Sequence, residues 1–273
     1  MATRVSKEMK ISLIVTTYNW KEALAITLES IKEQTLLPDE VIVADDGSHE
    51  DTKALIEAYQ LNYPTRLVHS WQEDVGFRLA ASRNKAIAKA QGDYLIIVDG
   101  DLYLPNTFIE SHASAAKNKC FVQGGRVLLG PIVSKKVIEN GYKPHFFSGD
   151  IRNRHNMLNS ALLSKIFTKI RNNDKSTRGC NFALWKKDAI AVNGYNEDFE
   201  GWGREDSEMV IRLLNNGLDR IYLKFQAVGY HIYHKESSRG MLEKNDLIYK
   251  NTIEKRSQHC VNGLDKYLLK SSQ

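Results

Sequence analysis

The 273-residue sequence is poor in cysteine, in proline and in long apolar runs. Its three cysteines, Cys120, Cys180 and Cys260, are far apart and form no CxxC pair, so neither a disulfide framework nor a cysteine zinc cluster is expected. With 5 prolines and 17 glycines, the chain has little room for low-complexity linkers. No run of about 18 apolar residues occurs and residues 1–10 are polar, so neither a spanning helix nor a secretory signal is predicted. We therefore expect a cytoplasmic globular protein.

The positive charge is small overall and unevenly distributed. The chain has 38 Lys and Arg against 33 Asp and Glu, a net charge of +5. A hydrophobic fraction of 42% and a charged fraction of 26% are ordinary for a globular protein and exclude wholesale disorder. Residues 151–178 contain seven basic residues and one acidic residue, so the remainder of the chain is close to neutral. The surplus is therefore a local basic segment.

Strand and helix patterns alternate over the first hundred residues. Short apolar, β-branched runs typical of buried strands occupy residues 11–15, 41–44, 67–68 and 94–98. Helices are predicted between them, at residues 19–34, 48–59 and 79–90, with Asn19 and Glu22 at capping-box spacing and Gly92 at the last C-terminus. This alternation predicts an α/β fold with a doubly wound parallel sheet. Neither GxGxxG nor GxxxxGK[ST] occurs, which disfavours a dinucleotide fold and a Walker-type phosphate loop.

Polar clusters follow three of the predicted strands, at residues 16–19, 45–48 and 99–101. Ligands of such sheets bind at the carboxyl ends of the strands, so three successive clusters indicate a binding site. In the last cluster, Asp99 and Asp101 are separated by Gly100, and both carboxylates can approach one divalent cation. Manganese and magnesium favour such oxygen ligands, often together with substrate phosphates.

Four ordered motifs resemble those of family 2 glycosyltransferases. They are the strand followed by TTYN, the strand followed by DDGS, the segment at residues 76–84, and the strand followed by DGD. The resemblance covers residues 10 to about 105. It implies the A-type nucleotide-sugar transferase fold, a Rossmann-like, mostly parallel central sheet flanked by helices, with a C-terminal acceptor-binding region.

The same resemblance implies roles for individual residues. Asp46 resembles the aspartate that binds the uracil ring, Asp99 the carboxylate near the ribose and sugar, and Asp101 the metal ligand. Manganese is the expected cofactor, with magnesium as the alternative. The implied donor-binding residues are Thr17, Tyr18, Asn19, Asp46, Arg78, Arg83, Asn84, Asp99 and Gly100.

An acidic pair begins a predicted helix in the second half, at Glu205 and Asp206. Acidic residues at a helix start are stabilised by the helix dipole, which is the structural interpretation. Sugar transfer with inversion also needs a base for the acceptor hydroxyl, and a carboxylate beside glycines and a tryptophan suits that task. The segment resembles the W-G-G-E-D motif of β-1,4-galactosyltransferases and chondroitin-polymerase-like enzymes, except at Arg204, where glycine is commoner. By that resemblance Asp206 is the base, and Glu205 binds the acceptor together with Trp202 and Gly203.

Two histidines follow, and one of them resembles the third metal ligand of these transferases. His231 fits the pattern best and His234 is the contender. The basic residues 235–239 would then form a flap near the pyrophosphate. The expected domain organisation is a flexible N-terminus (1–9), one transferase domain (10–240) and a helical tail (241–273). Within the domain, residues 10–105 bind the donor, 151–178 form the basic segment and 179–240 form the acceptor and catalytic half.

Within the basic segment, Leu158, Leu162, Ile166 and Ile170 recur at helical spacing. The preferred interpretation is a helix that packs this stripe on the domain, and contact with an anionic membrane is the alternative.

The sequence thus predicts a metal-dependent, inverting glycosyltransferase. It would move a hexose or N-acetylhexosamine from a UDP-sugar to a hydroxyl of a glycan or lipid-linked saccharide, forming a β-bond. Bacterial surface polysaccharide synthesis at the inner face of the plasma membrane is the expected setting. A sugar nucleotidyltransferase is the enzymatic alternative, although such enzymes usually have a Gly-rich basic loop after the first strand. The alternative without catalysis is a basic nucleic-acid-binding module, but no recognisable nucleic-acid motif occurs and no nucleic-acid partner is expected.

Overall fold

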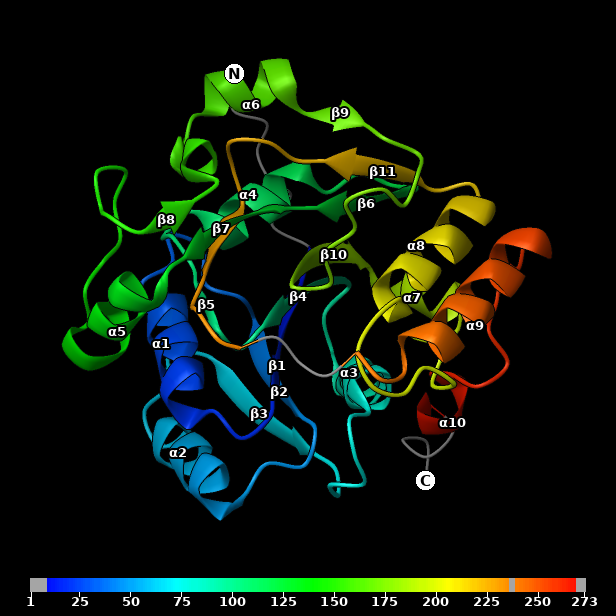
Figure 1. Ribbon diagram of the computed structural model, residues 1–273, viewed down its shortest axis with the longest axis horizontal. Coiled ribbons are helices and arrows are strands. Elements are labelled where there is room, and N and C mark those ends of the chain that lie inside the picture. The colour runs from blue at the N-terminus through cyan, green and yellow to red at the C-terminus, as the bar shows by residue number, and fades with distance from the viewer. Residues whose placement is uncertain (1–8, 236–238, 269–273) are drawn as a thin grey trace.

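A central eight-stranded sheet organises the protein (Figure 1). The computed structural model describes residues 9–235 and 239–268, so most of the predicted flexible N-terminus and the last five residues of the predicted tail lie outside it. The strand order is β3-β2-β1-β4-β10-β6-β11-β9. In chain order these strands are β1 (Ile11–Thr17), β2 (Glu40–Asp45), β3 (Arg66–Trp71), β4 (Tyr94–Asp99), β6 (Cys120–Gln123), β9 (Lys169–Ile170), β10 (Asn181–Trp185) and β11 (Asp219–Tyr222).

The sheet is mostly parallel, as predicted, but two strands run against the others. β1, β2, β3 and β4 pair in parallel, and β11 pairs in parallel with β6. β10 inserts antiparallel between β4 and β6, where Phe182 lies opposite both Ile97 and Gln123, and β9 is antiparallel to β11. The prediction of a mostly parallel central sheet is therefore confirmed, and the antiparallel pairing beyond β4 arises because β10 returns from the second half of the chain to pair there.

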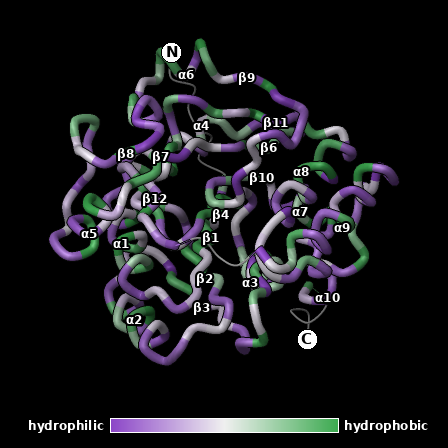
Figure 2. The backbone as a smooth tube through the Cα atoms, viewed as in Figure 1, coloured by the Kyte–Doolittle hydropathy of each residue, from purple (hydrophilic) through white to green (hydrophobic). Residues whose placement is uncertain are grey.

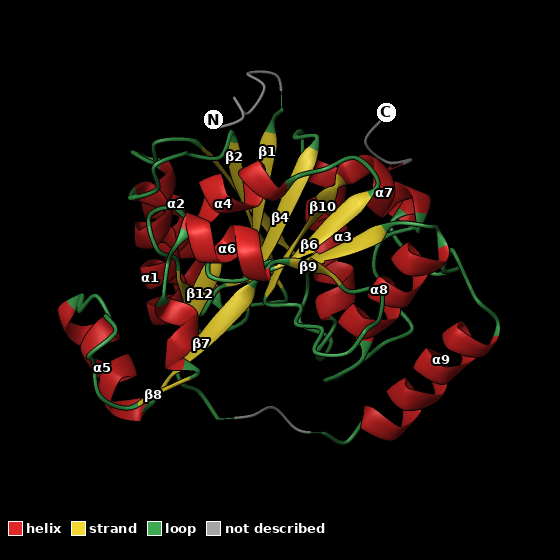
Figure 3. Ribbon diagram, turned by 90° about the horizontal axis from the view of Figure 1, so that it is seen from above, coloured by secondary structure: helices red, strands yellow, loops and turns green. Residues whose placement is uncertain are grey.

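Helices cover both faces of this sheet (Figures 1 and 3). The apolar sides of α1, α2 and α4 pack against one face, and those of α3, α7 and α8 pack against the other. Continuous apolar strands such as β1 are buried along their whole length because both faces are covered. The helices are α1 (Lys21–Lys32), α2 (Glu50–Gln60), α3 (Leu79–Lys89), α4 (Phe108–Ala115), α5 (Pro131–Asn140), α6 (Ala161–Phe167), α7 (Lys186–Ala191), α8 (Glu205–Asn215), α9 (Leu242–Glu254), α10 (Asp265–Leu268) and the short 3-10 helix η1 (Arg154–Met157).

A second, four-stranded sheet lies beside the first, in the order β5-β12-β7-β8. It consists of β5 (Leu102–Tyr103), β7 (Gly125–Leu129), β8 (Ile151–Arg152) and β12 (Val228–His231). β5 follows directly after β4, so this sheet continues from the carboxyl end of the central strands. Figure 3 shows it on one side of the molecule, with α8 and α9 on the other.

Two local expectations differ from the structure. Trp20 and His49 occupy the N-cap positions of α1 and α2, and neither helix has a side-chain cap, so the capping box from Asn19 to Glu22 does not form. Ala90 rather than Gly92 occupies the C-cap of α3. A Cβ at position 92 would lie 2.6 Å from the backbone nitrogen of Ser12, so this glycine permits close approach to β1 instead.

The basic segment is less helical and more exposed than predicted. Its helix spans only α6, and Ile170 belongs to the edge strand β9. Leu162, Ile166 and Ile170 are 69%, 59% and 60% exposed, so the preferred interpretation of a stripe packed on the domain is wrong. Figure 2 shows the hydrophobic stretches of α6 at the upper rim of the molecule.

Residues 9–235 and 239–268 include no helix with the length and apolar character needed to cross a bilayer.

Candidate active site

A cavity of about 790 Å³ opens at the carboxyl ends of β1, β2 and β4. Its lining comes from both halves of the chain, which brings the predicted donor motifs and the predicted catalytic pair to one place. The predicted residues that line it are Thr17, Tyr18, Asp46, Arg83, Asp99, Gly100, Asp101, Trp202, Glu205, Asp206, His231 and His234.

The turn between the two aspartates is fixed by contacts with β1. The Gly100 amide donates to the Thr16 carbonyl at 2.7 Å, and the Thr16 hydroxyl donates to Oδ1 of Asp99 at 2.9 Å. A Cβ at Gly100 would lie 2.5 Å from that carbonyl oxygen, so only glycine fits this close approach. The turn therefore holds Asp99 and Asp101 at the mouth of the cavity.

Asp101 meets both histidines. β12 pairs with β5, and the Ile232 amide donates to the Asp101 carbonyl at 2.9 Å. Oδ2 of Asp101 lies 3.4 Å from Nε2 of His231 and 3.2 Å from Nε2 of His234, and the three ligand atoms fall within 4.8 Å of one another. The hydrogen bond to Asp101 is the main cause that raises the pKa of His234 to about 9.

This cluster fits a divalent cation. Oδ1 of Asp101 is buried and has no hydrogen-bond partner among the described residues, which is unfavourable unless a ligand occupies that side. Nδ1 of His234 lies 2.7 Å from the Lys235 carbonyl, an outer contact that orients the ring and leaves Nε2 directed at Asp101. One carboxylate and two imidazoles are a donor set compatible with manganese, and less typical of magnesium.

Asp46 directly follows β2 and lines the same cavity. Its Oδ1 accepts from Nε2 of Gln72 at 2.5 Å and its Oδ2 from the Arg78 amide at 2.8 Å. Burial raises the pKa of Asp46 to about 6 despite these hydrogen bonds.

Arg83 joins the two halves of the site. Its side chain is 1% exposed, and its guanidinium donates to Oδ1 of Asp99 at 3.2 Å and to Oε1 of Glu205 at 3.1 Å. It also lies over the Tyr195 ring, 5.0 Å from the centroid. The guanidinium thus neutralises carboxylates of both halves. Arg83 also lines the cavity, so its contact with the donor stays a prediction.

The acidic pair occupies the first turn of α8. Oδ2 of Asp206 accepts from the Gly179 amide at 2.8 Å, and Oδ1 from the Ser207 amide at 2.6 Å. Burial, and then the negative charge of Asp206, raise the pKa of Glu205. Trp202 is 41% exposed and lines the same cavity, and the Arg239 guanidinium lies over its ring, 5.2 Å from the centroid. A ligand could therefore contact the ring face that Arg239 leaves open.

Arg204 accounts for the departure from the W-G-G-E-D pattern. Its φ is +77°, in the left-handed region that favours glycine. The strain is offset by contacts with α9, because Nε of Arg204 donates to Asp246 at 2.6 Å and the guanidinium lies over the Tyr249 ring. Asn245 adds hydrogen bonds to the carbonyls of Glu200 and Gly203. Helix α9 therefore holds the loop at Arg204 in a backbone conformation that glycine usually adopts.

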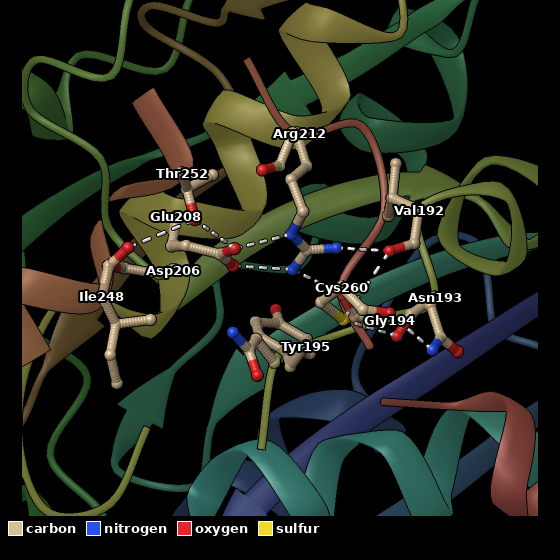
Figure 4. Close-up of polar contacts among 12 residues, drawn as sticks. Val192, Asn193, Gly194, Tyr195, Asp206, Glu208, Arg212, Ile248, Thr252 and Cys260 are labelled. Atoms are coloured by element: carbon tan, nitrogen blue, oxygen red, sulfur yellow. Dashed lines mark hydrogen bonds and ion pairs between the residues drawn. The ribbon is translucent and has the colours of Figure 1, made fainter. Parts of the chain in front are cut away.

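A buried ion pair anchors α8 behind the acidic pair (Figure 4). Arg212 and Glu208 are 0% and 1% exposed and form two hydrogen bonds, at 2.8 and 2.7 Å. The Arg212 guanidinium also donates to the carbonyls of Val192 and Gly194, and Thr252 of α9 donates to Glu208. One charged cluster thus connects α8 to α9 and to the loop after α7.

Four predicted site residues do not line the cavity: Asn19, Arg78, Asn84 and Gly203. Asn19 bonds with Ser48 and His49, and Arg78 donates to the Glu73 carbonyl and contacts Asp46 through its backbone. Asn84 is fully buried and bonds with Tyr195 and Glu197. Gly203 accepts a bond from α9. Most of their polar groups are used within the protein, but Nε of Arg78 is buried without a hydrogen-bond partner among the described residues. Direct contact of these residues with a donor or acceptor stays a prediction.

The structure also adds cavity residues that the sequence motifs did not identify. Arg126, Arg152 and Arg178 line the cavity, as does Trp20, whose ring packs edge-on against His234 at 5.8 Å. Lys235 and Arg239 of the predicted flap line it as well, and residues 236–238 lie outside the described residues. These positions belong to strands and loops without motif spacing, so only the tertiary arrangement reveals them.

Known proteins share both the sequence pattern and the fold. The chain is 26% identical over 234 residues to the chondroitin synthase of Pasteurella multocida (strain Pm70), a match that covers 78% of this chain and 24% of the synthase. The solved structure of GalNAc-T7 with UDP, GalNAc and Mn2+ matches 90% of this chain and 48% of that one, with a TM-score of 0.66 and 15% identity. The structure of S. aureus TarS 1–349 in complex with UDP matches 95% and 68%, with a TM-score of 0.61 and 16% identity.

The sheet and its flanking helices are the A-type glycosyltransferase fold, as predicted. The chain spans only about a quarter of the length of that chondroitin synthase. Residues 163–235 match the profile described as the N-terminal domain of galactosyltransferase, and residues 12–190 match that of glycosyl transferase family 2. Because the latter profile covers well over half of the chain, this protein belongs to glycosyl transferase family 2.

Proposed function

We propose that the protein is a metal-dependent, inverting glycosyltransferase that uses a UDP-sugar. The sugar, a hexose or N-acetylhexosamine, passes to a hydroxyl of a glycan or lipid-linked saccharide with formation of a β-bond. One observation supports this most directly: a single cavity contains the Asp101, His231 and His234 cluster together with Glu205 and Asp206. A cation site for a diphosphate and a basic carboxylate for a hydroxyl are the two groups that such a transfer needs.

In this mechanism Asp206 accepts the proton of the acceptor hydroxyl. The hydroxyl oxygen attacks the anomeric carbon from the face opposite to the UDP leaving group, so an α-linked donor gives a β-linked product. Glu205 binds an acceptor hydroxyl, and its raised pKa favours the protonated form that can donate. Trp202 supplies an apolar face for the sugar ring. The divalent cation, bound by Asp101 and the two histidines, would neutralise the charge of the departing diphosphate.

The test of the activity is a UDP-release screen. Purified protein is incubated with manganese and a panel of UDP-sugars, with and without glycan and glycolipid acceptors. We expect release that depends on both the acceptor and one sugar type. Absence of UDP binding and of release with every donor would contradict the proposal.

Removal of either histidine should weaken metal binding. We expect His231→Ala and His234→Ala each to lower manganese affinity by at least about tenfold, because each deletes one ligand atom. Titration calorimetry with manganese measures the effect, and EDTA should abolish UDP release from the unaltered protein. His259→Ala is the matched control, since His259 is exposed and far along the chain from the cluster. Unchanged affinity in one of the two variants would assign the ligand role to the other histidine alone.

Asp46 should make nucleoside binding pH-dependent. An ionised Asp46 accepts a hydrogen bond from the uracil N–H, whereas a protonated one does not accept it equally well. Its pKa of about 6 means that the ionised form is lost as the pH falls through 6. We therefore expect uridine, which has no titrating phosphate, to bind about tenfold more weakly at pH 5 than at pH 8. Calorimetry at both pH values tests this, and Asp46→Asn should remove the difference in uridine affinity between them. If that difference persists in the variant, Asp46 is not the group that causes it.

We further propose that the protein contacts an anionic membrane, as expected of synthesis of a bacterial surface polysaccharide such as lipopolysaccharide, O-antigen or capsule. The support is the exposed apolar side chains Leu162, Ile166 and Ile170, which alternate with the exposed cations Lys165 and Lys169. Apolar side chains can enter the headgroup boundary while the cations attract anionic lipids.

Liposome flotation tests this contact. Leu162→Glu with Ile166→Glu should weaken binding to anionic vesicles at least about tenfold, because each apolar side chain withdrawn from lipid forfeits about 1.5–3 kcal/mol. The matched control is Leu247→Glu with Ile253→Glu, which changes two exposed residues of α9. Equal flotation of the two variants and the unaltered protein would exclude this surface as the membrane contact.

A further inference from the structure

Among the arginines that line the cavity, Arg126, Arg152 and Arg178 form no ion pair with an acidic side chain of the described residues. Arg126 is partly buried, its Nε has no hydrogen-bond partner, and its Nη1 reaches only Sγ of Cys180, at 3.9 Å. Arg178 is also partly buried, and Arg152 is exposed at the end of β8. Like charges that line one cavity without an acidic partner repel one another, so a ligand that supplies an anion would stabilise this arrangement.

The second sheet fixes where two of these arginines lie. His231 of β12 is in register with Leu128 of β7, which is in register with Arg152 of β8. Adjacent strands are about 4.8 Å apart, so Arg152 lies roughly 10 Å from His231 along this row. Arg126 precedes Leu128 by two residues and therefore projects from the same face. This face lines the cavity from the predicted metal ligands to the two arginines.

The third arginine lies beside the acidic pair. Arg178 directly precedes Gly179, whose amide donates to Asp206, and Arg126 contacts the next residue, Cys180. In the central sheet, β1 and β4 lie between β10 and β2. β10 begins three residues after Arg178, and β2 ends at Asp45, one residue before Asp46. Arg178 and Arg126 are therefore closer to the carboxylate proposed as base than to the end of the sheet proposed for uracil.

We propose that Arg126, Arg152 and Arg178 form an anion subsite for the acceptor, so that the acceptor saccharide carries a carboxylate or a phosphate. The assignment rests on the proposed function, because it assumes that Asp206 is the base. The arginines would bind the charged group of the acceptor, and a neighbouring hydroxyl of the same acceptor would then reach Asp206. Guanidinium groups suit either anion, because their N–H donors match two oxygens at once. The diphosphate of the donor has other cations close by, in Lys235 and Arg239 and in the cation expected at Asp101.

The test compares three acceptors that differ only at C6 of one sugar: 4-nitrophenyl β-glucoside, the matching β-glucuronide, and the β-glucoside 6-phosphate. Binding of each is measured by calorimetry in the presence of UDP and manganese, so the result does not depend on turnover. We expect at least one anionic glycoside to bind about tenfold or more tightly than the neutral one. Whichever of the two anionic glycosides binds more tightly identifies carboxylate or phosphate as the recognised group.

Arg126→Gln and Arg152→Gln should each reduce that preference, and added salt should reduce it in the unaltered protein. Arg154→Gln is the matched control, because Arg154 lies two residues from Arg152 and outside the cavity lining. The absence of any preference among the three glycosides, whether all bind or none does, would overturn the subsite. A loss of UDP affinity in the two arginine variants would overturn it as well, by assigning the arginines to the donor. Failure of UDP itself to bind the unaltered protein would instead contradict the proposed function.

Discussion

Asp206→Asn is expected to reduce sugar transfer by about 10²–10⁴-fold, the usual contribution of a positioned general base. The asparagine has nearly the same shape, and its carbonyl oxygen can still accept from the Gly179 amide that now bonds to Asp206 at 2.8 Å. It cannot take a proton from the acceptor hydroxyl. The loss should therefore appear in kcat, measured as UDP release at saturating donor and acceptor.

UDP affinity is the second measurement on this variant. It should stay within about twofold of that of the unaltered protein, since Asp206 is proposed to face the acceptor rather than the nucleotide. Asp93→Asn is the matched control, because Asp93 is exposed at the opposite end of β4. Near-normal turnover of Asp206→Asn would remove Asp206 from the role of base and leave Glu205 as the candidate.

Arg212→Met should destabilise the protein by about 3–5 kcal/mol, as expected when one partner of a buried ion pair is removed. The substitution leaves Glu208 charged at 1% exposure and removes donors from the carbonyls of Val192 and Gly194. Because α8 begins with the proposed catalytic pair, the loss of this anchor should also reduce transfer in the protein that remains folded. The free energy of unfolding is measured by urea denaturation monitored by circular dichroism.

A double variant separates the buried charge from general disruption of the core. Glu208→Gln with Arg212→Met removes both charges, so it should be less destabilising than the sum of the single variants. Arg171→Met, at an exposed position, should change the free energy of unfolding by about 0.5 kcal/mol or less. A loss below about 1 kcal/mol in Arg212→Met would show that the pair does not anchor α8.

The donor half was predictable because its signals are local. The apolar runs of β1, β2 and β4 specify buried strands, and the residues that follow them, such as Asp46 and Asp99, must meet at the carboxyl edge of a parallel sheet. The acidic pair at Glu205 and Asp206 was likewise visible beside glycines and a tryptophan at a helix start.

Contacts between distant segments were not predictable in this way. The pattern of residues 181–185 indicates a strand, but not that it inserts antiparallel beside β4. Arg83 and Asn84 are neighbours in the sequence but have different partners. Asn84 bonds to the loop before α8, whereas Arg83 bridges Asp99 and Glu205. The exposure of Leu162 depends equally on which neighbours cover it.

The sequence by itself determined the class of fold, the order of the donor motifs and the acidic residues available for chemistry. Hydrophobic periodicity and turn chemistry act over a few residues, so they can be read along the chain. The tertiary structure alone decided that His231 and His234 both meet Asp101 and that α9 supports the loop at Arg204. It also decided that Arg126, Arg152 and Arg178 line the cavity without an acidic partner in the described part of the chain. These arrangements depend on the pairing of strands far apart in sequence, whose energies come from packing over the whole molecule and leave no local pattern.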